Sequence, residues 1–227
     1  MIVQRKLWVL VTCLGLLSTI LAAVIFPLFP DGGHAISDGY GGTVYAFEMA
    51  RTSADLTAVF GPETDLLRAS RIAAMNKGNL WDYAFMPAYA GFMGTFLWGA
   101  YRETDQKAWL IFGIIGLLSG VFDAIENAIL LGITADLKAA PLLTLLAFPV
   151  WAKFFSIAIA VASAGLFIAQ QNGLFRIAGL LTTIAMLAVL AAFYDASKFG
   201  SVSAQAIAFG WAVMLIYALN RSFSKTN

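Results

Sequence analysis

The chain has 227 residues, of which 60% are hydrophobic and only 12% are charged, and its mean hydropathy is +0.81. This composition is too apolar for an ordinary soluble globular protein and is typical of an integral membrane protein. The net charge of +1 gives no argument for nucleic acid as a partner, and a single cysteine and a single histidine argue against disulfides, cysteine-based zinc sites and bis-histidine haem within one chain.

Six segments approach or reach the ~20 apolar residues that a helix needs to cross a bilayer core of ~30 Å. In chain order they are Leu7–Phe29, Leu80–Tyr101, Ala108–Ile133, Leu142–Ala169, Leu174–Tyr194 and Val202–Leu219. We therefore predict an all-α fold, a polytopic bundle of about six transmembrane helices that forms one integral membrane domain over residues 1–227. Within it, residues 80–169 supply the core helices and residues 174–219 an additional helix pair.

The distribution of Lys and Arg in the short connections predicts the orientation of the bundle. With the N-terminus inside, the cytoplasmic side collects seven basic residues: Arg5, Lys6, Arg102, Lys107, Arg176, Arg221 and Lys225. We expect a multi-pass protein of the bacterial inner membrane with both termini in the cytoplasm. The first span is too long for a cleaved signal peptide and is interpreted as an uncleaved anchor.

Residues 30–79 form the only sizeable part outside the predicted spans. The segment opens with the glycine-rich stretch "PDGGHAISDGYGG", which indicates irregular backbone. Thr52 with Asp55 three residues later has the spacing of a capping box, and Gly61 ends the helix that follows. A further helix is expected to end at Gly78. These short amphipathic helices are predicted to form an outer cap over the bundle or to lie in the membrane interface.

The stretch "GLLSGVFDAIENAIL" places two carboxylates and an amide inside the third predicted span. On a helix, Asp123 is a neighbour of both Glu126 and Asn127, so the three side chains share one face. Gly116 and Gly120 precede them on nearly the same stripe, in a GxxxG spacing that permits close approach of another helix. This acidic face is therefore predicted to point toward protein and not toward lipid.

Three further residues are expected to join this polar cluster in the outer half of the bundle. Asp82 lies near the outer end of the second span, Tyr89 lies deeper on the same face, and Lys153 enters the fourth span from outside. Charged residues within membranes are costly and usually pair or mark a functional path. One lysine cannot neutralise all the carboxylates, so a carboxyl is protonated, or water or a cationic ligand group enters.

The predicted ligand-binding set comprises Asp82, Tyr89, Asp123, Glu126, Asn127 and Lys153. The sequence is equally compatible with a different interpretation, in which the same residues form a buried polar staple that fixes helix register. Asp82 could simply cap its helix or meet water, and Tyr89 could simply pack in the core.

Four stretches, "FEMARTSADLTAVFG", "WDYAFMPAYAGFMG", "FDAIENAIL" and "WAKFF", resemble a group of small bacterial inner-membrane proteins with an Asp-x-x-Glu-Asn motif in a transmembrane helix. The resemblance covers roughly Leu7 to Ala169. It implies a common multi-helix membrane core and transfers no reaction, with the last two spans as an addition to that core.

These features favour a protein that binds or moves a lipid or small amphiphile at an acidic pocket in the outer half of the bundle. Two alternatives are a structural or accessory subunit of a membrane complex, with another membrane protein as partner, and a proton- or cation-coupled carrier. An enzyme is less favoured, because no nucleophile motif, phosphate loop, metal set or cofactor fingerprint is present. We predict no cofactor, no metal and no nucleic-acid partner.

Overall fold

The structure, a computed structural model, describes residues 2–138 and 140–223, and within those ranges it contains helices and no strands. In chain order its α-helices (α) and 3-10 helices (η) are α1 (Ile2–Ile25), η1 (Phe26–Leu28), η2 (Asp38–Tyr40), α2 (Thr43–Glu48), α3 (Ser53–Phe60), α4 (Arg68–Thr104), α5 (Ala108–Ala135), α6 (Ala140–Ile168), α7 (Leu174–Thr182), α8 (Ile184–Tyr194) and α9 (Ala196–Phe223).

Five helical stretches among the described residues are long and apolar enough to cross a membrane. They are Gln4–Leu28, Ala108–Ala135, Pro141–Ile168, Leu174–Tyr194 and Ala196–Phe223. The fourth of these combines α7 and α8, which are separated only at Thr183. The predicted all-α membrane bundle is thus confirmed.

The remaining predicted span, Leu80–Tyr101, which is the second in chain order, lies within α4 and does not reach the same apolarity. Its polar and small residues face neighbouring helices, since α4 packs between α1 and α5 along much of its length. A helix that is shielded by protein on two sides needs less apolar surface than a helix that faces lipid all round. That α4 crosses the membrane stays a prediction.

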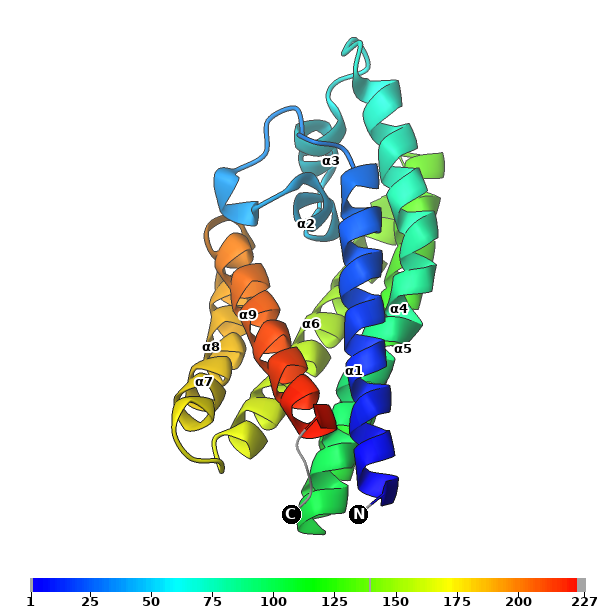
Figure 1. Cartoon of the computed structure of the whole chain (residues 1–227). Coiled ribbons are helices and arrows are strands. Elements are labelled where there is room, and N and C mark those ends of the chain that lie inside the picture. The colour runs from blue at the N-terminus through cyan, green and yellow to red at the C-terminus, as the bar shows by residue number, and fades with distance from the viewer. Residues whose placement is uncertain (1, 139, 224–227) are drawn as a thin grey trace.

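The long helices form a bundle whose two ends differ (Figure 1). At one end the start of α1 meets the end of α9, where Arg5 Nε donates to the carbonyl oxygen of Ser222 at 3.1 Å. Thr12 Oγ1 and Ser222 Oγ are 2.9 Å apart at the same end. From there α1 and α9 diverge toward the opposite end, where α2 and α3 lie (Figure 1).

The short helices α2 and α3 cover this second end of the bundle. The predicted capping box is present, with Thr52 and Asp55 bonded reciprocally at the start of α3. The rings of Phe47 and Phe60 meet edge to face at 4.9 Å and belong to one buried cluster with Leu130 of α5. This burial holds the cap segment against the bundle.

The prediction that a cap helix ends at Gly78 is wrong, because α4 runs through this residue without a break. A side chain at Gly78 would collide with the ring of Phe29, which packs directly on the helix here. The glycine therefore permits close packing and does not terminate the helix, and residues 68–79 belong to α4 rather than to the cap.

Close packing around α5 follows the predicted glycine stripe. A Cβ atom at Gly116 would lie 3.1 Å from the Cβ of Ala160 on α6, and one at Gly120 would lie 3.0 Å from the Cβ of Ala90 on α4. Both separations are shorter than normal van der Waals contact. The absence of side chains on this stripe thus lets α4 and α6 approach the face of α5 that carries the acidic residues.

Candidate functional site

The three polar residues of α5 face the interior of the bundle, as predicted. Asp123, Glu126 and Asn127 are 5%, 0% and 2% exposed. Neighbouring positions such as Val121 and Ile125 point outward and are about half exposed. The helical period thus separates an outer apolar face from an inner polar face on the same helix.

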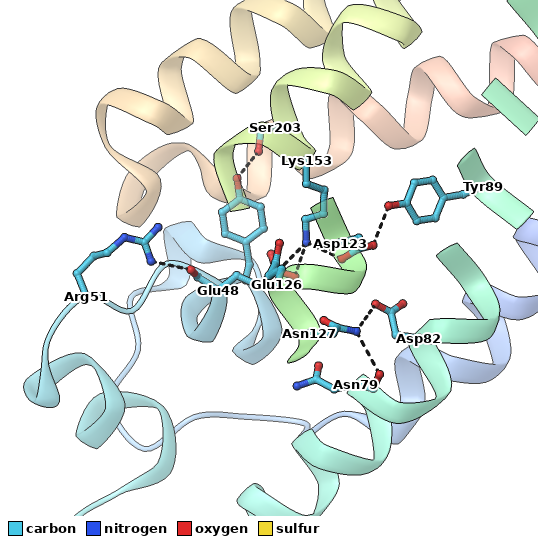
Figure 2. Close-up of polar contacts among 11 residues, drawn as sticks. Glu48, Arg51, Asn79, Asp82, Tyr89, Asp123, Glu126, Asn127, Lys153 and Ser203 are labelled. Atoms are coloured by element: carbon cyan, nitrogen blue, oxygen red, sulfur yellow. Dashed lines mark hydrogen bonds and ion pairs between the residues drawn. The ribbon is translucent and has the colours of Figure 1, made fainter. Parts of the chain in front are cut away.

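Lys153 of α6 is the centre of this polar cluster (Figure 2). Its Nζ donates to Glu126 Oε1 at 2.8 Å, to Asp123 Oδ1 at 3.2 Å and to Glu48 Oε1 at 3.0 Å. Its ammonium group also lies 4.8 Å from the centroid of the Phe154 ring. All three donor positions of the ammonium are therefore used, and the charge is held within the protein.

Glu48 was not among the predicted site residues, because the sequence assigned it to the outer segment. The end of α2 brings its carboxylate to Lys153, and its side chain is only 11% exposed. One signal in the sequence could have indicated this position, since Glu48 is the only charged residue between Asp38 and Arg51. The cap thus contributes a charged group to the membrane cluster and is tied to α6 through it.

The cap makes a second polar contact with the bundle through Tyr45. Burial raises the pKa of Tyr45 to about 12, so its hydroxyl stays protonated at neutral pH. This hydroxyl lies 2.9 Å from Ser203 Oγ on α9 (Figure 2). Glu48 and Tyr45, one turn apart on α2, therefore connect the cap to α6 and α9 respectively.

On the other side of the cluster, α4 contributes Tyr89, Asp82 and Asn79. The Tyr89 hydroxyl donates to Asp123 Oδ2 at 2.8 Å. Asn127 Nδ2 donates both to Asp82 Oδ2 at 3.0 Å and to the carbonyl oxygen of Asn79 at 3.1 Å (Figure 2). All six residues of the predicted set therefore lie together, across α4, α5 and α6.

Two buried polar atoms of this cluster have no hydrogen-bond partner among the described residues. They are Glu126 Oε2 and Asn79 Nδ2. An unpaired buried donor or acceptor costs ~1–3 kcal/mol, so such atoms call for an explanation. The described residues thus leave part of the hydrogen-bonding capacity of the cluster unused.

A cavity of about 830 Å³ adjoins the cluster. Its apolar walls come from α1, η1, α4, α6 and α9, while its polar floor comes from α2, α4, α5 and α6. The floor consists of Tyr45, Glu48, Asn79, Asp82, Tyr89, Asp123 and Lys153. Acidic groups therefore sit at the base of an apolar chamber.

Exposed residues line the cavity between α1 and α9, which diverge here, and also at Gly41 and Gly42 before α2. Thr19 on α1 and Gln205 and Ala208 on α9 line it and are exposed. These positions lie in two of the stretches that are apolar enough to span a membrane. Between α1 and α9 the cavity therefore faces the surroundings that those two helices face, which in a membrane is lipid.

A layer of aromatic side chains closes the bundle between the cavity and the end that holds the start of α1. Trp8, Phe96, Phe167 and Tyr217 are each at most 2% exposed, and the rings of Trp8 and Phe96 are 5.3 Å apart. The ring of Tyr217 lies 5.5 Å from that of Trp8. The cavity therefore does not continue through the bundle in this conformation.

Four residues of the predicted set, Asp82, Tyr89, Asp123 and Lys153, line the cavity. Glu126 and Asn127 do not, because they lie behind the floor. Glu126 holds Lys153 from there, and Asn127 holds Asp82. The two residues therefore support side chains of the floor, and the ligand-binding role of the six residues stays a prediction.

The described residues contain no group of three or more His, Cys, Asp or Glu side chains placed to hold a metal ion. No family model matches the chain, and no curated protein or solved structure matches it. The resemblance to small inner-membrane proteins stays a prediction, and the function is argued from the geometry of the site.

Proposed function

We propose that this protein binds a lipid or small amphiphile in the cavity between α1 and α9, either to retain it or to move it. The observation that carries the proposal is the combination of an apolar chamber, a polar floor and exposed lining residues between α1 and α9. Ligand pockets in proteins are mainly apolar concave sites of ~300–1,000 Å³ with a few convergent polar groups. The cavity has this character and size.

An amphiphile fits this arrangement because its two parts have different requirements. The alkyl portion would pack on side chains such as Phe26, Phe85 and Trp211, which line the walls. The head group would reach the floor at Asp82 and Asp123. A ligand entering sideways would exchange one apolar environment for another and would need no aqueous route.

The proposal is tested first by mass spectrometry of the protein purified in mild detergent. A co-purifying amphiphile at about one per chain is expected. The cavity can then be filled by Ala22→Trp, because Ala22 lines it. Ala23→Trp is the matched control, since Ala23 is the next residue on α1, is exposed and does not line the cavity.

Loss of the bound amphiphile in Ala22→Trp and its retention in Ala23→Trp would support the proposal. Retention in both variants would place the ligand elsewhere. An empty wild-type preparation that also takes up no added amphiphile would contradict the proposal.

A coupled carrier, the second candidate, would need the aromatic layer around Trp8 and Tyr217 to open. That layer separates the cavity from the far end of the bundle. The buried contacts of Lys153 with Glu126 favour a structural contribution of those two residues within the same site. Binding with retention is therefore the simpler proposal, and an accessory role with another membrane protein is compatible with it.

We further propose that the chain lies in the bacterial inner membrane with both termini in the cytoplasm. Support comes from the basic residues at the end where α1 begins and α9 ends, including Arg5 and Arg221. The cap and the cavity would then belong to the outer half. Labelling of a Lys138→Cys variant from outside intact cells, in a Cys13→Ser background, tests this orientation.

A further inference from the structure

Asp82 is the carboxylate of the cavity floor that has no cationic partner among the described residues. Lys153 is bonded to Glu48, Asp123 and Glu126, which uses its three donors. Asp82 accepts one hydrogen bond, from Asn127 Nδ2 at 3.0 Å. Three carboxylates therefore share a single ammonium, and Asp82 is the fourth acidic side chain of the cluster, which no cation of the described residues contacts.

The other cation close to the cluster does not correct this imbalance. Arg51 Nη1 donates to the carbonyl oxygens of Glu48 and Ala50, at 2.8 and 2.7 Å, and so lies on the outer side of α2. Figure 2 shows its guanidinium on the side of Glu48 away from Asp82. No ion pair of the described residues includes Arg51, and its guanidinium donates to backbone carbonyl oxygens instead.

A second, independent feature of the floor points to a ligand. Asn79 lines the cavity beside Asp82, is only 1% exposed, and its Nδ2 donates to no atom of the described residues. A buried amide donor without a partner is rare in native structures. Asn79 and Asp82 are one helical turn apart on α4, so their side chains lie on the same face of that helix.

We infer that the ligand carries a protonated amine, which binds the Asp82 carboxylate, next to an oxygen that accepts from Asn79. The inference rests on the proposed function and specifies the chemistry of its ligand. A cationic nitrogen supplies the charge that the floor lacks and forms hydrogen bonds of the strong, charge-assisted kind. A phosphate or carboxylate alone would meet the acidic floor with like charge.

The test compares three probes that share one alkyl chain: decylamine, decanol and decanoate. At neutral pH their head groups are cationic, neutral and anionic. Equilibrium binding is measured on the full chain in nanodiscs, with empty nanodiscs subtracted to remove partition into lipid. Decylamine is expected to bind at least about 10-fold more tightly than decanol, and decanoate most weakly.

Asp82→Asn removes the charge and keeps the acceptor for Asn127. It should weaken the binding of decylamine about 10- to 100-fold and leave the affinity for decanol unchanged. Asp31→Asn is the matched control, because Asp31 is exposed and does not line the cavity. It should change neither affinity.

The outcomes separate this inference from the proposed function. Equal affinity of the wild type for decylamine and decanol would overturn the inference that the ligand carries an amine, while the proposal of amphiphile binding would stand. Unchanged affinity of Asp82→Asn for decylamine would overturn the role of this carboxylate. Failure of all three probes to bind the wild type would contradict the proposed function itself. The comparison of probes on the wild type needs no variant to fold.

Discussion

Replacing Lys153 with Met removes the one ammonium that three buried carboxylates share. The side chains of Lys153, Glu48 and Asp123 are 6%, 11% and 7% exposed, so water cannot readily replace the lost contacts. Removing one partner of a buried ion pair destabilises proteins by about 3–5 kcal/mol, because an uncompensated charge remains. We expect the loss of unfolding free energy in Lys153→Met to lie in or above that range.

The acidic partner should behave differently. Glu126→Gln keeps an oxygen that can accept from Lys153 Nζ, and it removes one of three carboxylates that compete for one ammonium. Hydrogen bonds between membrane helices contribute ~0.6 kcal/mol on average, so weakening this one should cost about 1 kcal/mol or less. The excess of acidic groups therefore predicts that Lys153→Met destabilises the protein much more than Glu126→Gln, although Lys153 and Glu126 contact each other directly.

The free energy of unfolding of both variants is measured by denaturant titration in mixed micelles. Lys138→Met is the control for loss of a lysine, because Lys138 is 85% exposed and only 3.7 Å from exposed Glu63. Its free energy of unfolding should lie within about 0.5 kcal/mol of that of the wild type. Equal costs for Lys153→Met and Glu126→Gln would refute the argument that the cluster has surplus acid.

Three further changes test other parts of the structure. Tyr89→Phe removes the donor to Asp123 Oδ2, and the unfolding free energy should fall by about 1–3 kcal/mol because a buried acceptor loses its partner. Gly120→Ala places a methyl group 3.0 Å from a Cβ atom of α4, so overpacking should lower the unfolding free energy by about 1–3 kcal/mol. The control Gly91→Ala should not destabilise the protein, because the atom closest to its added methyl group is 3.7 Å away. Finally, a hydrogen bond from an arginine lowers the pKa of Asp65 in the cap to about 2. The ionised carboxylate therefore stabilises the cap above about pH 4, and the difference in Tm between wild type and Asp65→Asn should shrink as the pH falls below that value.

Each of these has an outcome that contradicts it. A Tyr89→Phe variant as stable as the wild type would mean that another donor replaces the hydroxyl. Equal Tm values for Gly120→Ala and Gly91→Ala would show that α4 and α5 separate at no cost. A Tm difference for Asp65→Asn that persists unchanged at low pH would mean that packing, and not charge, explains the effect.

The residue pattern by itself was sufficient for the helical membrane bundle. Long apolar runs and helical spacing depend on neighbours close in sequence, which is why five of the six spans and the inward direction of Asp123, Glu126 and Asn127 were predicted correctly. The same reasoning failed at Gly78. Its role depends on the ring of Phe29, a residue far away in the chain.

Only the tertiary structure decided what the cluster contains and what lies beside it. Glu48 joins Lys153 because the cap folds back over the bundle, and no local pattern specifies where a short outer helix will dock. The cavity exists because α1 and α9 touch at one end and diverge at the other. Hydropathy and periodicity describe which face of a helix is polar. The space between two helices depends instead on contacts between residues far apart in the chain, such as Thr12 and Ser222, which are 210 positions apart.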